Sequence, residues 1–276
     1  MSYGITQDQL EFVQDKIEKQ ANFLDKNSYL FPTTGEFKTL RDLSYSPNHS
    51  ERYYARLQNR VNTFVTINEL NGYVPLFLNV TLDGFFRRFM HGDFSEWTPE
   101  LRDQYKHHIP NNKQRGFILD KIDNHETLTP KDVYKIGNYQ FYNWYRSGTY
   151  QRIKKEGHKL HFIKATEPHK DGTPHWHLLY FVPKHELENL KKEFDKFFPA
   201  PRNKVKLTRR NTKKSKYPRD ALPIGKTEWE TQGFQIKVHN PISYIMKYIN
   251  KSLQDLRANK AIDKLQAWYI FHKIPR

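Results

Sequence analysis

A tight turn at residues 170–172 constrains the fold more than any other feature of this sequence. The segments on either side, 159–167 and 174–182, have the composition and length of β-strands. The turn reads Lys170-Asp171-Gly172, and its glycine can take the left-handed conformation that a three-residue hairpin loop needs. The sequence therefore predicts an antiparallel hairpin whose register is set by this loop.

The predicted register brings together three side chains of types that bind metal ions. If His169 pairs with Thr173, then Glu167 lies opposite His175, and His177 shares their face because side chains alternate along a strand. Two imidazoles and one carboxylate suit Mg²⁺ or Mn²⁺ acting as a Lewis acid. We therefore expect Glu167, His175 and His177 to be metal ligands, with His169 as a spare candidate beside the turn. The alternative is a pair of surface histidines on a solvated sheet face, near an ordinary charged residue.

A second pattern repeats the phrase Tyr-Ile-x-Lys over residues 244–251 and includes the only Tyr-x-x-x-Tyr of a chain with 17 tyrosines. Asn240 and Pro241 are good N-cap and first-turn residues, which predicts a helix from here to about residue 253. Helical spacing gives this helix one polar and one apolar stripe. The polar stripe consists of Tyr244, Lys247, Tyr248 and Lys251, and the apolar stripe of Ile242, Ile245, Met246, Ile249 and Leu253.

The polar stripe is a candidate catalytic face. A tyrosine hydroxyl, with an ordinary pKa of about 10, is a weak nucleophile that needs a polarised electrophile or a cationic neighbour. The predicted metal would supply the first and Lys247 or Lys251 the second, with Tyr244 and Tyr248 as nucleophiles. The alternative is that the two tyrosines only flank a buried helix face.

The charge of the chain predicts a polyanionic partner. It has 46 Lys+Arg against 30 Asp+Glu, a formal net charge of +16, and aromatic residues make up 15% of it, which favours nucleic acid. One segment holds nine basic residues and no acidic one, and we expect it to grip DNA phosphates rather than to be only a solvated loop. Its basic residues are Arg202, Lys204, Lys206, Arg209, Arg210, Lys213, Lys214, Lys216 and Arg219.

The order of the expected elements predicts an α+β fold with a mostly antiparallel sheet, because strands and helices follow no regular βαβ rhythm. Residues 1–70 read as a helical extension, residues 71–255 as the main domain, and residues 256–276 as a helix packing on it. Within the main domain we expect strands at 76–82, 159–167, 174–182 and 234–238, helices at 131–156, 185–197 and 240–253, and loops with short helices at 91–130.

Several classes of protein are excluded or disfavoured by composition. The chain has no cysteine, which rules out a disulfide framework and a thiol nucleophile. Its first residues lack the character of a signal peptide, and no stretch approaches 18 apolar residues. The expectation is therefore a cytoplasmic protein without membrane association.

Together these patterns resemble the three ordered motifs of HUH endonucleases, and most closely those of two-tyrosine phage replication initiators. The motifs are the strand at 76–82, the segment 167–177 and the doubled Tyr-Ile-x-Lys. The resemblance implies a central five-stranded antiparallel sheet flanked by helices. It also implies that one tyrosine attacks single-stranded DNA at a replication origin, leaving a 5′-phosphotyrosine and a 3′-OH for a DNA polymerase. The second tyrosine would serve the closing transfer, and a host helicase would unwind the duplex.

Three other readings use part of the same features. A transposase or conjugative relaxase of the HUH type shares the chemistry. A non-catalytic basic DNA-binding protein explains the charge but leaves both ordered motifs unexplained. A mononuclear or binuclear metallohydrolase would need more His and Asp ligands than the later strands offer.

The basic segment generates the first testable prediction. Replacing its lysines and arginines with glutamine should weaken binding to all single strands and lower the log–log salt slope by about 0.7 for each phosphate that is no longer neutralised. Binding titrations at several salt concentrations measure this slope. An unchanged slope would mean that the segment is only a solvated linker.

Overall fold

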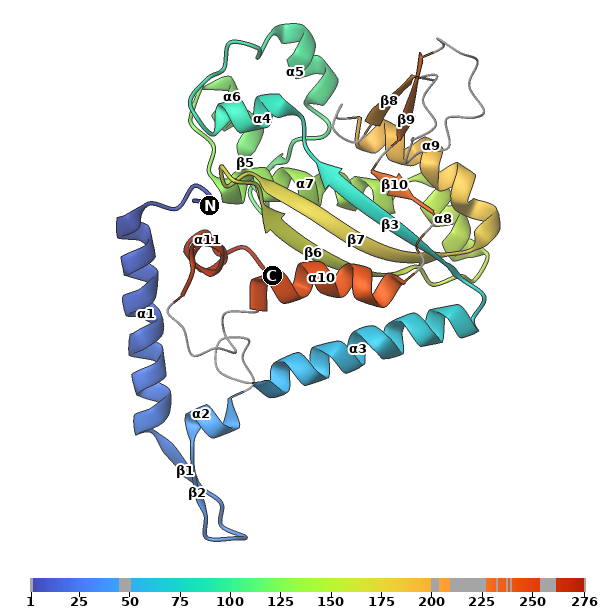
Figure 1. Cartoon of the computed structure of the whole chain (residues 1–276). Coiled ribbons are helices and arrows are strands. Elements are labelled where there is room, and N and C mark those ends of the chain that lie inside the picture. The colour runs from blue at the N-terminus through green and yellow to red at the C-terminus, as the bar shows by residue number, and fades with distance from the viewer. Residues whose placement is uncertain are drawn as a thin grey trace. The chain divides into compact units, whose positions relative to one another are not determined.

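The structure is a computed structural model that describes residues 2–44, 51–199, 204–208, 227–231, 233–236, 238, 240–253 and 262–275 (Figure 1). Its helices are α1 (Gln7–Lys26), α2 (Leu40–Leu43), α3 (Glu51–Leu70), α4 (Gly84–Phe89), α5 (Pro99–Tyr105), α6 (Ile118–Asp123), α7 (Pro130–Tyr145), α8 (Gly148–Lys155), the 3-10 helix η1 (Lys184–Glu186), α9 (Leu187–Phe197), α10 (Pro241–Leu253) and α11 (Lys264–Phe271). Its strands are β1 (Ser28–Leu30), β2 (Phe37–Thr39), β3 (Val74–Thr81), β4 (Asn111–Asn112), β5 (Gly116–Phe117), β6 (His161–Pro168), β7 (Pro174–Val182), β8 (Lys204–Thr208), β9 (Thr227–Thr231) and β10 (Phe234–Gln235).

Four strands form the main sheet, in the order β10-β3-β7-β6. β10 pairs antiparallel with β3, Phe234 lying opposite Leu78, and β6 and β7 form the predicted hairpin. This mixture of helices with antiparallel sheet agrees with the predicted α+β class. The expected fifth strand is not found among the described residues. Their other strands instead pair with a neighbour along the chain, in the separate hairpins β1–β2, β4–β5 and β8–β9.

Three local predictions need correction. The expected helix at 131–156 is two helices, because the side chain of Ser147 caps α8 by accepting a hydrogen bond from the backbone N–H of Tyr150. The basic segment, expected to be a loop, starts with a strand at 204–208 that pairs antiparallel with β9. The helical region at 1–70 is interrupted by the hairpin β1–β2. No helix of the described residues is long and apolar enough to span a bilayer.

The chain divides into two compact units, each built from separate stretches of sequence. Unit 1 consists of Met1–Val74, Ile163–His177 and His239–Arg276, and unit 2 of Pro75–Phe162 and Leu178–Val238. The expected domains at 1–70, 71–255 and 256–276 stay a prediction. The helices of the first 70 residues belong to the same unit as the His-x-His and Tyr-x-x-x-Tyr motifs.

Unit 2 is organised around α7. Its first turn carries a capping box in which Thr129 and Asp132 satisfy each other's backbone N–H groups, which explains why the helix begins there. Near its end, Trp144 is fully buried, and its ring meets the rings of Tyr150, Phe194 and Phe198 at centroid distances of 5.2, 6.0 and 5.7 Å. This aromatic cluster fixes α8 and α9 against α7.

In unit 1, the loop of the β6–β7 hairpin is held by residues from both ends of the sequence. The backbone N–H of His169 donates to the carbonyl of Thr173 at 2.8 Å, and Gly172 has φ +90°, so the predicted pairing and glycine conformation are both confirmed. The indole of Trp268 on α11 donates a 3.0 Å hydrogen bond to the carbonyl of Gly172. A Cβ atom at Gly172 would lie 2.8 Å from the carbonyl oxygen of Tyr3.

The close approach at Gly172 generates a stability prediction. Gly172→Ala should lose about 1–2 kcal/mol from the left-handed backbone and about 1–3 kcal/mol more from displacing Tyr3. Gly72→Ala, in the same unit at φ +74°, is the matched control, because no atom of the described residues lies within 4 Å of the added Cβ, and it should show only the backbone cost. Urea denaturation measures both free energies of unfolding. Equal losses in the two variants would contradict the role given to the close approach of Tyr3.

Candidate active site

Helix α10 presents the two tyrosines as the sequence predicts. Asn240 caps it, its Oδ1 accepting a 2.9 Å hydrogen bond from the backbone N–H of Ser243. Ile245 and Met246 are buried and anchor the helix. Tyr244 and Tyr248 are half-buried on another part of its surface, where Lys247 and Lys251 are exposed. The polar stripe is therefore present, as is the Ile245–Met246 part of the apolar stripe, while the side chain of Leu253 lies outside the described residues.

The two tyrosines lie next to each other. Their ring centroids are 5.8 Å apart, and the rings meet edge to face at 73°. Burial raises the pKa of Tyr248, and a hydrogen bond with Tyr244 and the nearby charge of Glu167 raise it further. The Tyr248 phenol is thus held in its protonated form and would need added positive charge to become a nucleophile.

His177 joins the tyrosine helix to the β6–β7 hairpin. Its imidazole stacks on the ring of Tyr248, with centroids 3.5 Å apart and planes at 22°. Burial lowers the pKa of His177, and the neighbouring Glu167 only partly opposes this effect. The neutral imidazole that results is the form that coordinates metals. Two motifs that lie about 70 residues apart in the sequence thus meet at one point.

Glu167 is a buried carboxylate with two partners. His177 Nε2 lies 3.5 Å from one of its oxygens, and Lys251 Nζ lies 3.4 Å from both. Burial alone would raise the pKa of Glu167, but the hydrogen bond from His177 and the charge of Lys251 more than offset it, and the pKa is lowered. The site therefore holds a carboxylate anion whose counter-charge is a half-exposed lysine.

His175 continues this cluster. Its ring centroid lies 4.5 Å from that of His177 and 4.9 Å from that of His169, so His175 and His177 share one side of β7. Trp176, between them in sequence, is fully buried. Side chains therefore alternate between the two faces of β7, as the sequence predicts for a strand.

The chemistry of these donors fits a divalent cation. Glu167 contacts His177, and His175 lies beside His177, but the ligand atoms of the three residues do not all lie within 4.8 Å of one another. Glu167 Oε1 is buried without a hydrogen-bond donor among the described residues. A cation at that oxygen would satisfy it more fully than the Lys251 ammonium does at 3.4 Å. The ligand assignment of Glu167, His175 and His177 remains a prediction, as does the catalytic role of the tyrosines and lysines.

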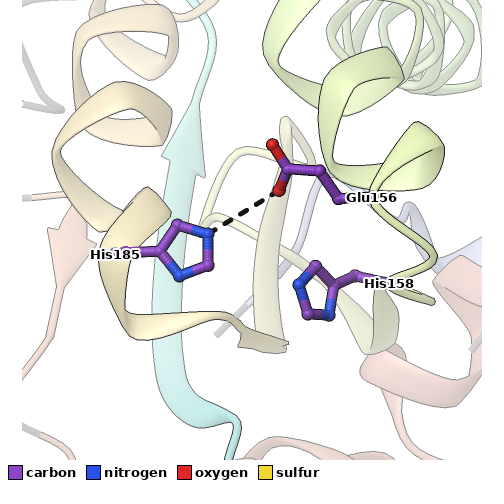
Figure 2. Close-up of side chains that lie close together, drawn as sticks. All are labelled: Glu156, His158 and His185. Carbon is purple, nitrogen blue, oxygen red and sulfur yellow. Dashed lines mark ion pairs between the residues drawn. The ribbon is translucent and has the colours of Figure 1, made fainter.

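A group of side chains of metal-binding types that was not predicted from the sequence lies in unit 2. Figure 2 shows Glu156, His158 and His185, whose ligand atoms all lie within 4.8 Å of one another. His185 Nε2 is 3.7 Å from Glu156, and Arg152 is 3.8 Å from the same carboxylate. Within the described part of the chain, this is the one trio of His, Cys, Asp or Glu residues that meets that spacing. The pattern Glu-Gly-His at 156–158 hints at it, but its partner at position 185 has no signal in the sequence.

Most of the predicted DNA-binding segment lies outside the described residues. This applies to Arg202, Arg209, Arg210, Lys213, Lys214, Lys216 and Arg219. Lys204 and Lys206 belong to β8, where Lys206 lies opposite Trp229 in the register with β9.

The family and the known proteins that match this chain all have descriptions that refer to replication. Residues 2–255 match the family described as bacteriophage replication gene A protein (GPA). A "Replication protein" of Haemophilus phage HP1 is 45% identical over 38 residues, which cover 14% of this chain and 5% of the relative. A "Probable replication endonuclease from prophage-like region" of Salmonella typhimurium is 25% identical over 134 residues, or 44% of this chain and 15% of the relative. The "Replication gene A protein" of Escherichia phage 186 is 37% identical over 51 residues, 17% of this chain and 7% of the relative.

These matches cover only a small part of each relative, and no solved structure matches the chain. The family match, in contrast, extends over all but the first residue and the last 21 residues of the sequence. The chain therefore belongs to the bacteriophage replication gene A protein family.

Proposed function

We propose that this phage replication protein nicks and rejoins single-stranded DNA through a tyrosine nucleophile, and so starts and ends rolling-circle replication. The observation that carries the proposal is the stacking of Tyr248 on His177, which in turn pairs with the buried Glu167. A nucleophile thus lies directly against side chains suited to hold a cation. The name of the Salmonella relative, a probable replication endonuclease, supports the same class of activity.

In the proposed reaction, the hydroxyl oxygen of Tyr248 or Tyr244 attacks a phosphodiester phosphorus. The new bond joins phosphorus to the tyrosine oxygen, and the bond from phosphorus to the 3′-oxygen of the preceding nucleotide breaks. The phenol proton ends on that 3′-oxygen, so the products are a 5′-phosphotyrosine and a free 3′-OH. Attack by a 3′-OH on the phosphotyrosine reverses the step and rejoins a strand.

The remaining groups of the site would bind and polarise the phosphate. Glu167, His175 and His177 would hold Mg²⁺ or Mn²⁺, which supplies Lewis-acid polarisation of a phosphate oxygen. Lys247, whose ammonium is 5.6 Å from the centre of the Tyr248 ring, and Lys251 would offset the charge that gathers on the phenol oxygen. The expected partners are single-stranded origin DNA, a DNA polymerase that extends the 3′-OH, and a host helicase.

The proposal predicts how adduct formation divides between the two tyrosines. Tyr244→Phe and Tyr248→Phe should each still attach covalently to a single-stranded oligonucleotide, while the double variant should not. Because Tyr248 is the one stacked on His177, it should carry the larger share of adduct in the unmodified chain. Each change keeps the ring, so the free energy of unfolding should move by about 1 kcal/mol or less.

Gel shift of the denatured protein and peptide mapping of the adduct measure these outcomes. If one tyrosine takes no label even when it stands alone, the paired mechanism is wrong, and a nickase with one tyrosine is the better description. If the double variant still forms adduct, neither tyrosine is the nucleophile.

A second prediction concerns the cation. His175→Ala or His177→Ala should lower the rate of adduct formation with Mn²⁺ by about 100-fold or more, because Lewis-acid polarisation contributes several kcal/mol. Most oligonucleotide affinity should remain, since phosphate contacts elsewhere supply it. Chelation of the metal by EDTA should lower the rate of adduct formation as the two substitutions do.

The cluster in Figure 2 provides the matched control for this experiment. The double variant His158→Ala/His185→Ala also removes two imidazoles from a potential metal group, but it should leave adduct formation unchanged. Metal binding measured in that background reports the proposed site alone. Loss of adduct in this control, with retention in His177→Ala, would contradict the assignment.

A further inference from the structure

An open pocket in unit 2 combines guanidinium groups with tyrosine rings on the surface of α7. Its volume is about 340 Å³, and it is lined by two arginines, two tyrosines, two asparagines and a glutamine. None of the described residues that line it is acidic. None of its residues takes part in the site proposed above, and none belongs to a motif recognised in the sequence.

The pocket forms where a hairpin meets one face of a helix. Tyr139 and Tyr142 lie at helical spacing on α7, and Arg146 is the residue that caps its C-terminal end. Another face of this helix is buried through residues such as Trp144. The hairpin β4–β5 supplies Arg115. The side chain of Asn112 fixes that turn by accepting a 3.0 Å hydrogen bond from the backbone N–H of Arg115.

The two arginines converge on one tyrosine ring. The guanidinium carbon of Arg115 lies 3.9 Å from the ring centre of Tyr142 and 4.8 Å from that of Tyr139. The guanidinium of Arg146 lies 5.3 Å from the Tyr142 ring and donates a hydrogen bond to its hydroxyl. The two tyrosine rings are nearly parallel, at 12° and 6.4 Å between centroids. Tyr142 remains exposed at 38%.

This arrangement concentrates positive charge for which the described residues provide no carboxylate partner. Within the described part of the chain, neither Arg115 nor Arg146 forms an ion pair with a carboxylate, whereas Arg88, Arg102 and Arg152 of the same unit each do. Hydrogen bonds from Arg146 and Arg115 lower the pKa of the Tyr142 phenol. This shift is a further effect of the positive charge around the ring. Two guanidiniums at one ring repel each other, and an anion between them would relieve the repulsion.

We propose that this pocket, the Arg115–Tyr142 cradle, binds a single-stranded nucleic acid, with phosphates on Arg115 and Arg146 and a base stacked on Tyr142. Planar guanidinium groups match phosphate oxygens, and aromatic rings stack on bases of any sequence. The inference rests on the proposed function for the identity of the strand as origin DNA. A free nucleoside phosphate offers the same chemistry, so the test must separate the two.

The test measures binding without cleavage. The full chain carrying Tyr244→Phe and Tyr248→Phe is titrated into fluorescein-labelled oligothymidylate, and anisotropy is followed at several salt concentrations. Added to this background, Arg115→Gln/Arg146→Gln should lower the log–log salt slope by about 1.4, or about 0.7 for each of two phosphates. The matched control Lys154→Gln/Lys155→Gln removes two exposed charges from α8 of the same unit and should leave the slope unchanged.

Changes at Tyr142 test stacking separately from charge. Tyr142→Leu should weaken binding about 5- to 150-fold, the equivalent of about 1–3 kcal/mol for one stacked base. Tyr142→Phe keeps the ring and should stay within about twofold of the parent. The proposed cradle would be contradicted by equal salt slopes in the arginine and lysine double variants. Equal affinities of the Tyr142→Leu and Tyr142→Phe variants would contradict it as well. If free thymidine monophosphate competes equally well at the same concentration of bases, the ligand of the cradle is a free nucleotide and not a single strand.

Failure of the cradle and failure of the proposed function give different results. Adduct formation by the unmodified chain tests the tyrosines, and binding by the double Phe background tests the pocket. If adduct forms but the arginine variant binds like the lysine control, the cradle is wrong and the nickase proposal stands. If no adduct forms but the arginine and Tyr142→Leu variants lose affinity, the cradle stands without the nickase.

Discussion

The buried contact of Glu167 with His177 and Lys251 is the constraint on which the candidate site depends. A carboxylate with little exposure to water must be paired, and here its partners come from β7 and from the last turn of α10. The pairing holds the tyrosine helix against the hairpin, with the Tyr248 ring stacked on His177. Because its lysine partner is a flexible, half-exposed side chain, the carboxylate is well suited to exchange that partner for a stronger cation.

Local patterns were sufficient to predict much of this site. The cap at Asn240 and the two stripes of α10 depend on residues within a few turns of each other, and the register of the β6–β7 hairpin depends on Gly172. Both kinds of signal lie within a short stretch of sequence, so they can be read without knowing the rest of the fold. The family match then agrees with the resemblance seen in these motifs at the level of a phage replication protein.

What could not be predicted involves residues that are distant in sequence. The ion pair of Lys251 with Glu167 spans 84 positions, and the sequence predicts for Lys251 only a role beside the tyrosines. The break at Ser147 was missed because most residues on both of its sides favour helix, although Ser147 and Gly148 form a dipeptide that is typical of turns. Arg115 and Tyr142 have no pattern in common, since a hairpin turn and a helix face are brought together only by tertiary packing.

The β6–β7 hairpin loop, beside the candidate histidines, depends on residues that lie outside the recognisable motifs. Its carbonyls are contacted by Ser2 near one end of the sequence and by Trp268 near the other, while the recognisable motifs all lie between residues 73 and 253. A shortened chain that kept every motif would retain the candidate chemical groups without the side chains that orient them. The candidate catalytic groups and the residues that hold them in place therefore occupy different lengths of the chain in this family member.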